Sequence, residues 1–159
     1  MAVFYSFHYD NDVFRVQLVK KIGAVEGQPL LNSQDWEQVK RGGSTAIANW
    51  IDKEMKYKTA VIVLIGKETS TRPWVKYEIE KAWNDKRPLL GIYIHGLASL
   101  NHGADNKGSN PFDVVDGVYG LPTFDPTQTD WSGTIDTKAT YDNLAANLKT
   151  WSEQGRVRP

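Results

Sequence analysis

The sequence predicts an α/β fold in which helices cover both faces of a mostly parallel β-sheet. Two runs, TAVIVLIG at 59–66 and PLLGIYI at 88–94, are continuously apolar and are typical of strands buried on both faces. Segments with helical spacing of apolar residues stand between the expected strands. Alternation of strands and helices gives a three-layer sandwich with the sheet in the middle. A chain of 159 residues fits one domain, so we expect a single domain over residues 1–159.

The first part of the chain predicts a strand and a helix. Residues 2–7 (AVFYSF) are rich in β-branched and aromatic types and indicate a strand. In NDVFRVQLVKKIG, residues 11–23, the apolar side chains recur at helical spacing and Gly23 suits the end of the helix. Residues 24–43 contain scattered Gly and a Pro. We expect them to be irregular, with one short strand around Leu30–Leu31.

The middle of the chain predicts two helices on either side of the buried strand 59–66. Ser44 suits the N-cap of a helix that continues to about Met55. After the strand, a second helix is expected within residues 69–83 (TSTRPWVKYEIEKAW). Pro73 suits its first turn, Ser70 or Thr71 can cap it, and Val75, Ile79 and Ala82 form its buried stripe.

The last part predicts a strand, a long loop region and a final helix. The strand is the run 88–94. Residues 95–126 are rich in Gly, Asn, Asp and Pro, and we expect a loop region with at most short strands. The final helix is expected at about 137–154, with Leu144, Leu148 and Trp151 on one side.

Composition excludes several classes of function. Lys plus Arg and Asp plus Glu both count 19, so no net positive charge favours nucleic acid or anionic lipid. Cysteine is absent, which excludes disulfides and thiolate sites, and His8, His95 and His102 lack metal-ligand spacing. No phosphate-loop, dinucleotide or nucleophile-elbow motif is present. No signal peptide or membrane span is expected, so the cytoplasm is the expected location.

One acidic residue in the helix 69–83 is a candidate for chemistry. Ligands of parallel α/β sheets bind outside the carboxyl ends of the strands, and this helix begins there. Trp74 lies four residues before Glu78, so both occupy one helical face and an aromatic wall stands beside the carboxylate. The alternative is that Glu78 is a solvated surface charge, which is the commoner role of a helical glutamate.

Four stretches together resemble a known family. FYSFHYDND at 4–12, LIGKETSTRPWVKYEIEKAW at 64–83, LLGIYIHGL at 89–97 and GSNPF at 108–112 are similar to the bacterial TIR-like proteins typified by ThsB of the Thoeris anti-phage defence system. The resemblance covers roughly residues 2–112. It implies a flavodoxin-like TIR fold and an NAD glycohydrolase or cyclase that releases nicotinamide and makes a cyclic ADP-ribose isomer, which activates a separate effector protein.

The resemblance also implies site residues. Glu78 matches the catalytic glutamate of the family and Trp74 the tryptophan one turn before it. Phe7, His8 and Asp10 follow the first strand, where family members line the NAD pocket, and His8 stands near the place where a typical member has arginine. NAD is then the substrate, with no cofactor and no metal. Because cyclisation folds the ligand back and requires a closed pocket, a further hypothesis is that the 95–111 loop supplies a lid.

Other interpretations stay open at this stage. The chain could be a non-catalytic TIR-like interaction module in which Glu78 pairs with Lys76 or Lys81 on the helix surface. It could also be a different nucleotide-binding or nucleoside-processing domain of the same fold. Self-association, a phage-derived trigger, and the choice between linear and cyclic products are likewise open.

Overall fold

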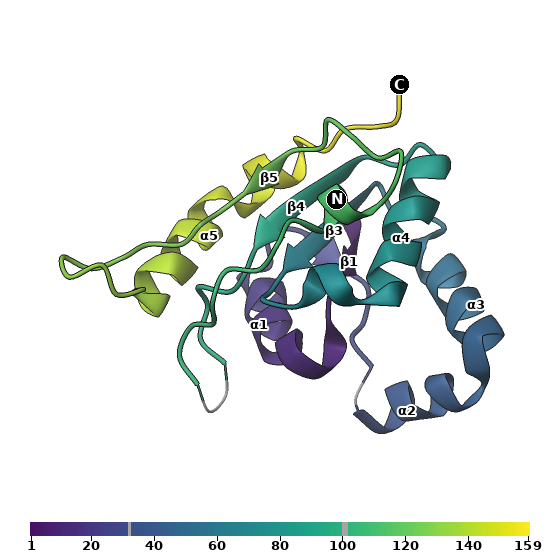
Figure 1. The fold of residues 1–159 in the computed structure, drawn as a ribbon, viewed down its shortest axis with the longest axis horizontal. Helices are drawn as coiled ribbons and strands as arrows, with labels where there is room; N and C mark the ends of the chain where they lie inside the picture. Colours follow the sequence, from purple (N-terminus) through teal and green to yellow (C-terminus); the bar gives the residue numbers. More distant parts are fainter. Residues whose placement is uncertain (32, 100–101) are drawn as a thin grey trace.

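A computed structural model of the chain describes residues 1–31, 33–99 and 102–159. Its centre is a parallel sheet in the order β2-β1-β3-β4-β5, of which Figure 1 labels β1, β3, β4 and β5. The strands are β1 (Ala2–Ser6), β2 (Glu26–Gly27), β3 (Ala60–Ile65), β4 (Leu89–Tyr93) and β5 (Thr123–Phe124). The predicted α/β fold is therefore confirmed, and so are the strands expected at 2–7, 59–66 and 88–94.

Helices cover both faces of this sheet, as in a flavodoxin-like or TIR-like sandwich (Figure 1). The α-helices are α1 (Tyr9–Ile22), α2 (Ser33–Arg41), α3 (Gly43–Met55), α4 (Pro73–Asn84) and α5 (Thr137–Ser152). The described residues also form two short 3-10 helices, η1 (Thr69–Thr71) and η2 (Pro111–Val114). Apart from η2 and β5, the described part of the expected loop region 95–126 has neither helix nor strand.

The buried strand β3 divides the core into two layers. Side chains alternate along a strand, so Ile62 and Leu64 pack with α1 and α5. Val61, Val63 and Ile65 point the other way and pack with α3 and α4. All six residues of β3 are fully buried, which explains why the sequence run at this place is apolar without alternation.

The segment 24–43 differs from the prediction. It was expected to be irregular with a strand around Leu30–Leu31, but the strand is β2 at Glu26–Gly27 and a helix, α2, follows. The apolar side chains of α2 are Trp36 and Val39, too few for a helical pattern to stand out in the sequence. Tertiary packing decides this segment, because both residues lie against the core cluster that α3 helps to form.

Helix starts also differ from the prediction. Gly42, not Ser44, is the N-cap of α3. In α4, Pro73 is at the first turn as predicted, but Ser70 and Thr71 belong to η1 and do not cap the helix. The N-cap residue of α4 is Arg72, which forms no side-chain cap hydrogen bond. The end of α1 is as expected, with Gly23 in the left-handed conformation at φ 73°.

None of the helices in the described part of the chain is both long and apolar enough to cross a membrane. Within the same residues, no group of three or more His, Cys, Asp or Glu side chains is arranged to hold a metal ion.

Candidate functional site

A cleft opens where β1 ends, between the start of α1, the segment after β2, and the helices α2, α3 and α4. All five residues predicted for the site line this one cleft. They are Phe7, His8, Asp10, Trp74 and Glu78. Phe7, His8 and Asp10 reach it because they directly follow β1, and Trp74 and Glu78 because α4 begins beside the same edge of the sheet.

Glu78 is a buried carboxylic acid in the wall of the cleft. Glu78 is only 7% exposed, so the interpretation of Glu78 as a solvated surface charge is wrong. The Ser6 hydroxyl, at the end of β1, donates a hydrogen bond of 2.8 Å to Glu78 Oε1. Burial raises the pKa of Glu78 from its usual 4.5 to about 8, against the lowering effect of the Ser6 hydrogen bond. Such a shift in a cleft is typical of a functional carboxyl group.

Aromatic rings build much of the wall around this acid. Tyr9 lies between Phe7 and Trp36, with ring centroids 6.1 and 5.5 Å away, and Trp36 meets Trp50 at 6.0 Å. Trp74 also lines the cleft and packs edge-on against Tyr77. Flat apolar walls with a few polar groups are typical of sites that bind planar rings.

Several residues of the cleft were not among the predicted site residues. Trp36 and Lys40 come from α2, a helix that was not predicted, although a loop at 31–45 was expected at this edge of the sheet. Gln28 follows the short strand β2, and its side-chain amide pairs with both the backbone N–H and the carbonyl of Tyr5. Arg72 was visible in the sequence as the residue before Pro73. It was not among the predicted site residues, although its segment was expected at the carboxyl edge of the sheet.

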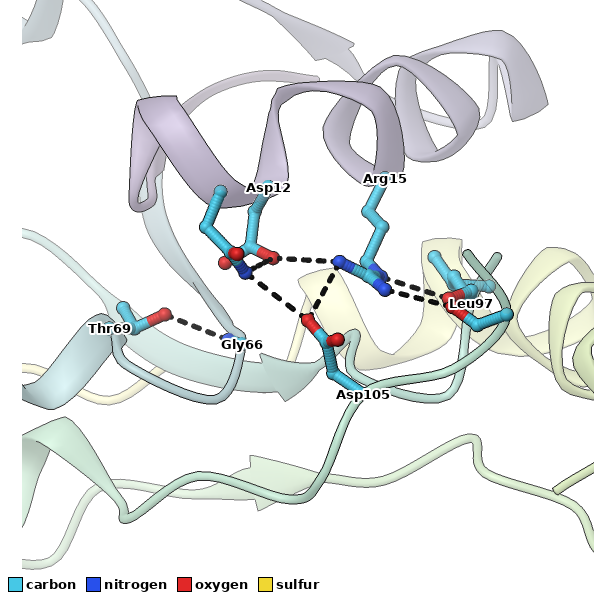
Figure 2. Close-up of polar contacts among 8 residues, drawn as sticks. Asp12, Arg15, Gly66, Thr69, Leu97 and Asp105 are labelled. Atoms are coloured by element: carbon cyan, nitrogen blue, oxygen red, sulfur yellow. Dashed lines mark hydrogen bonds and ion pairs between the residues drawn. The ribbon is translucent and has the colours of Figure 1, made fainter. Parts of the chain in front are cut away.

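The segment expected as a lid is instead fastened elsewhere. Arg15, on α1, is 1% exposed and forms ion pairs with Asp12 at 3.2 Å and Asp105 at 3.0 Å (Figure 2). Its guanidinium also donates to the carbonyl oxygens of Leu97 and Gly103. None of the described residues in 95–111 lines the cleft. In this structure Arg15 holds the described part of the loop against α1, and closure over a ligand stays a prediction.

The backbone that follows β3 is tightly packed against Asp12 of α1 and against Gly108. The N–H of Gly66 donates to Thr69 Oγ1 at 2.8 Å (Figure 2). A Cβ atom on Gly66 would lie 2.0 Å from Asp12 Oδ2, and one on Gly108 would lie 2.3 Å from the Gly66 carbonyl oxygen. Both positions require glycine, since backbone or buried side chains fill the space of a larger residue.

The interaction-module alternative predicted a surface ion pair of Glu78 that is absent from the described residues. Glu78 is hydrogen-bonded to Ser6, whereas Lys81 pairs with Asp85 at 2.9 Å and lies 3.8 Å from Asp52. Glu78 therefore has the environment of a site residue and not of a helix-surface charge.

The fold and the cleft define a TIR-like α/β domain with a buried carboxyl group at the carboxyl edge of a parallel sheet. Comparison with known proteins agrees: residues 4–99 match the family described as Thoeris protein ThsB, TIR-like domain. The match covers more than half of the chain, so the protein belongs to this family, as the resemblance implied.

A relative from Bacillus cereus (strain MSX-D12) is 29% identical over 136 residues. The alignment covers 82% of this chain and 71% of the relative. That protein is named "Putative cyclic ADP-D-ribose synthase ThsB1".

Proposed function

We propose that this protein cleaves the bond between nicotinamide and ribose in NAD and produces a cyclic ADP-ribose isomer. The observation that carries the proposal is Glu78, a buried carboxyl group in an aromatic-walled cleft. Membership of the ThsB family and the name of the Bacillus cereus relative support this proposal. In this role the product activates a separate effector during anti-phage defence in the cytoplasm.

One carboxyl group is sufficient for this chemistry. The nicotinamide of NAD is a pyridinium cation. When the C1′–N bond breaks, its electron pair goes to the nicotinamide nitrogen and nicotinamide leaves as a neutral molecule, so no general acid is needed. What remains is an oxocarbenium-like ribose. The Glu78 carboxylate is suited to stabilise it electrostatically, more strongly in a cleft walled by Trp74 and Phe7 than in water.

The product depends on what then attacks C1′. Water gives linear ADP-ribose, whereas a hydroxyl or an adenine nitrogen of the same molecule gives a cyclic isomer. When a hydroxyl attacks, the new C1′–O bond forms as the hydroxyl loses its proton, and Glu78 is suited to orient that hydroxyl or accept its proton. We propose cyclisation because the relative is named as a cyclic ADP-D-ribose synthase.

The test compares the protein with a Glu78→Gln variant, incubated with NAD and resolved for nicotinamide and ribosyl products by chromatography. Glu80→Gln is the matched control, since Glu80 lies on the same helix and is exposed. We expect Glu78→Gln to slow nicotinamide release at least about 100-fold, as loss of a preorganised charge typically does. Glu80→Gln should retain the rate of the unmodified protein.

The reaction is run with and without lysate from phage-infected cells, because dependence of the activity on a phage-derived trigger is an open interpretation. The carboxylate is the active form, so kcat/KM should rise as the pH rises towards about 8, the pKa of Glu78. Equal rates for the unmodified protein and Glu78→Gln would remove Glu78 from its proposed role. No nicotinamide release in either condition would overturn the enzymatic function.

A further inference from the structure

A buried hydroxyl group lies behind Glu78, at a position where the sheet otherwise carries apolar side chains. Ser6 is the last residue of β1 and is fully buried. Side chains alternate along a strand, so Ser6 points to the same face of the sheet as Phe4, the face covered by α3 and α4. Phe4 and Val63, the residue that pairs with Ser6 on β3, both belong to the apolar cluster on this face. A hydroxyl group buried there is unfavourable unless it forms a hydrogen bond.

Glu78 is the partner of this hydroxyl group. Ser6 Oγ donates to Glu78 Oε1 at 2.8 Å, and neither side chain forms another hydrogen bond with the described residues. Glu78 lines the cleft, whereas Ser6 does not. The hydroxyl group therefore holds the carboxyl group from the side of the sheet, behind the wall of the cleft.

The second oxygen of the carboxyl group is free to meet a ligand. Glu78 Oε2 has no hydrogen-bond partner among the described residues, and it is not one of the fully buried polar atoms that lack a partner. It is therefore accessible, and because Glu78 lines the cleft, Oε2 is accessible from there. Rotation of the carboxyl group would break the bond to Ser6, so this bond determines which oxygen faces the cleft.

We propose that Ser6 is a positioning residue for Glu78, which holds Oε1 so that Oε2 faces the ribose of the substrate. This inference rests on the proposed function, in which NAD occupies the cleft. Ser6 is fully buried and does not line the cleft, so it acts on the reaction through Glu78. A carboxylate that is held in place stabilises the developing charge without reorganising first, and a small displacement of such a group slows the reaction.

The same hydrogen bond favours the ionised form of Glu78. Burial raises the pKa of this carboxyl group to about 8, and the bond from Ser6 opposes that rise. The other titratable or charged groups that line the cleft are Tyr5, His8, Tyr9, Asp10, Lys40 and Arg72. None of these groups contributes to the shift of the pKa of Glu78. Removal of the Ser6 hydroxyl group should therefore raise the pKa of Glu78 further.

The first test measures nicotinamide release by Ser6→Ala. We expect kcat to fall about 10- to 100-fold at unchanged KM, because a hydrogen bond to a charged group is lost and no contact with the substrate is removed. The rise of kcat/KM with pH should also move to higher pH. Ser152→Ala is the matched control, since Ser152 is buried in α5, donates to the Leu148 carbonyl oxygen and does not line the cleft. It should change neither the rate nor the pH profile.

A double variant separates positioning from a general effect on the structure. Because Ser6 acts through the carboxylate, adding Ser6→Ala to Glu78→Gln should slow the residual release less than about twofold. A loss as large as that of Ser6→Ala in the unmodified protein would show that Ser6 acts independently of Glu78, and would overturn the proposal.

A titration that needs no turnover completes the test. The carboxyl carbon of Glu78, identified by its absence from the NMR spectrum of Glu78→Gln, is followed against pH in the unmodified protein and in both serine variants. The same spectra show that each variant is folded. We expect the midpoint to move to higher pH in Ser6→Ala and to stay unchanged in Ser152→Ala.

The outcomes distinguish this role of Ser6 from the proposed reaction. An unchanged midpoint or an unchanged kcat in Ser6→Ala would overturn the positioning role and leave the reaction intact. Absence of nicotinamide release from the unmodified protein would instead overturn the reaction, even if the midpoint moves.

Discussion

At the scale of single residues, Glu78 shows how one side chain connects function to stability. In the unfolded chain this carboxyl group loses its proton near its usual pKa of 4.5, and in the folded protein near about 8. Between pH 4.5 and about pH 8, the folded state holds on Glu78 a proton that the unfolded state has released. The stability contributed by this group is therefore complete below pH 4.5 and declines as the pH rises towards 8.

This gives a prediction for Glu78→Gln. Glutamine keeps an oxygen that can accept the Ser6 hydrogen bond but never ionises, so the variant should be more stable than the unmodified protein at pH 8, by on the order of a few kcal/mol. At pH 5 the two should differ much less. Urea unfolding at both pH values measures the effect. A difference that is the same at pH 5 and pH 8 would contradict the raised pKa.

At the scale of elements, α2 and the loop after β4 both differ from what their sequences favour. The helix α2 forms a wall of the cleft through Trp36, although its sequence is mostly polar. None of the described residues in the loop after β4 lines the cleft, although the length and composition of this loop favoured a functional lid. Long-range contacts decide both cases: Trp36 packs on Trp50, and Arg15 binds Asp105 across the fold.

Arg15 is expected to control the order of that loop. Arg15→Met leaves the buried Asp12 without its cation and removes the bonds to the Leu97 and Gly103 carbonyls, so the free energy of unfolding should fall by about 3 to 5 kcal/mol. Backbone amide exchange at Leu97 and Asp105 should accelerate more than exchange in β3.

The matched control for this prediction is Lys21→Met, which removes an exposed cation from the same helix. That change should alter the stability by less than about 0.5 kcal/mol. If Arg15→Met had as small an effect, the ion pairs of Arg15 would not be what fastens the loop.

At the scale of the whole molecule, the sheet separates a supporting layer from the layer that forms most of the cleft. Leu64 is fully buried in the cluster under α1 and α5 and does not line the cleft, whereas Ile51, also buried, does line it. Leu64→Ala and Ile51→Ala should each lower the free energy of unfolding by about 2 to 5 kcal/mol, because both leave a cavity in a packed core.

Their effects on the cleft should differ. Below the unfolding temperature, Leu64→Ala should retain the rate of nicotinamide release, while Ile51→Ala should lower this rate because it alters the wall of the cleft. Denaturant unfolding and chromatography of the products, on the same two variants, measure this. Equal losses of nicotinamide release in both would show that the two layers are not independent.

Among the described elements, local sequence patterns were enough to predict the α/β class, the three longer strands, four of the five α-helices, and the helical face shared by Trp74 and Glu78. These features depend on local periodicity and on long apolar runs, which are visible without any tertiary contact. The resemblance also identified residues that do line one cleft, although their roles remain proposals.

Tertiary structure alone decided the rest. The helix α2 and its contribution to the cleft, the fastening of the loop by Arg15, and the uncapped start of α4 depend on residues distant in the sequence or on competition between neighbouring caps. Above all, only the packed structure buries Glu78 and raises its pKa, because desolvation is a property of the surrounding core and is not encoded in a helical pattern.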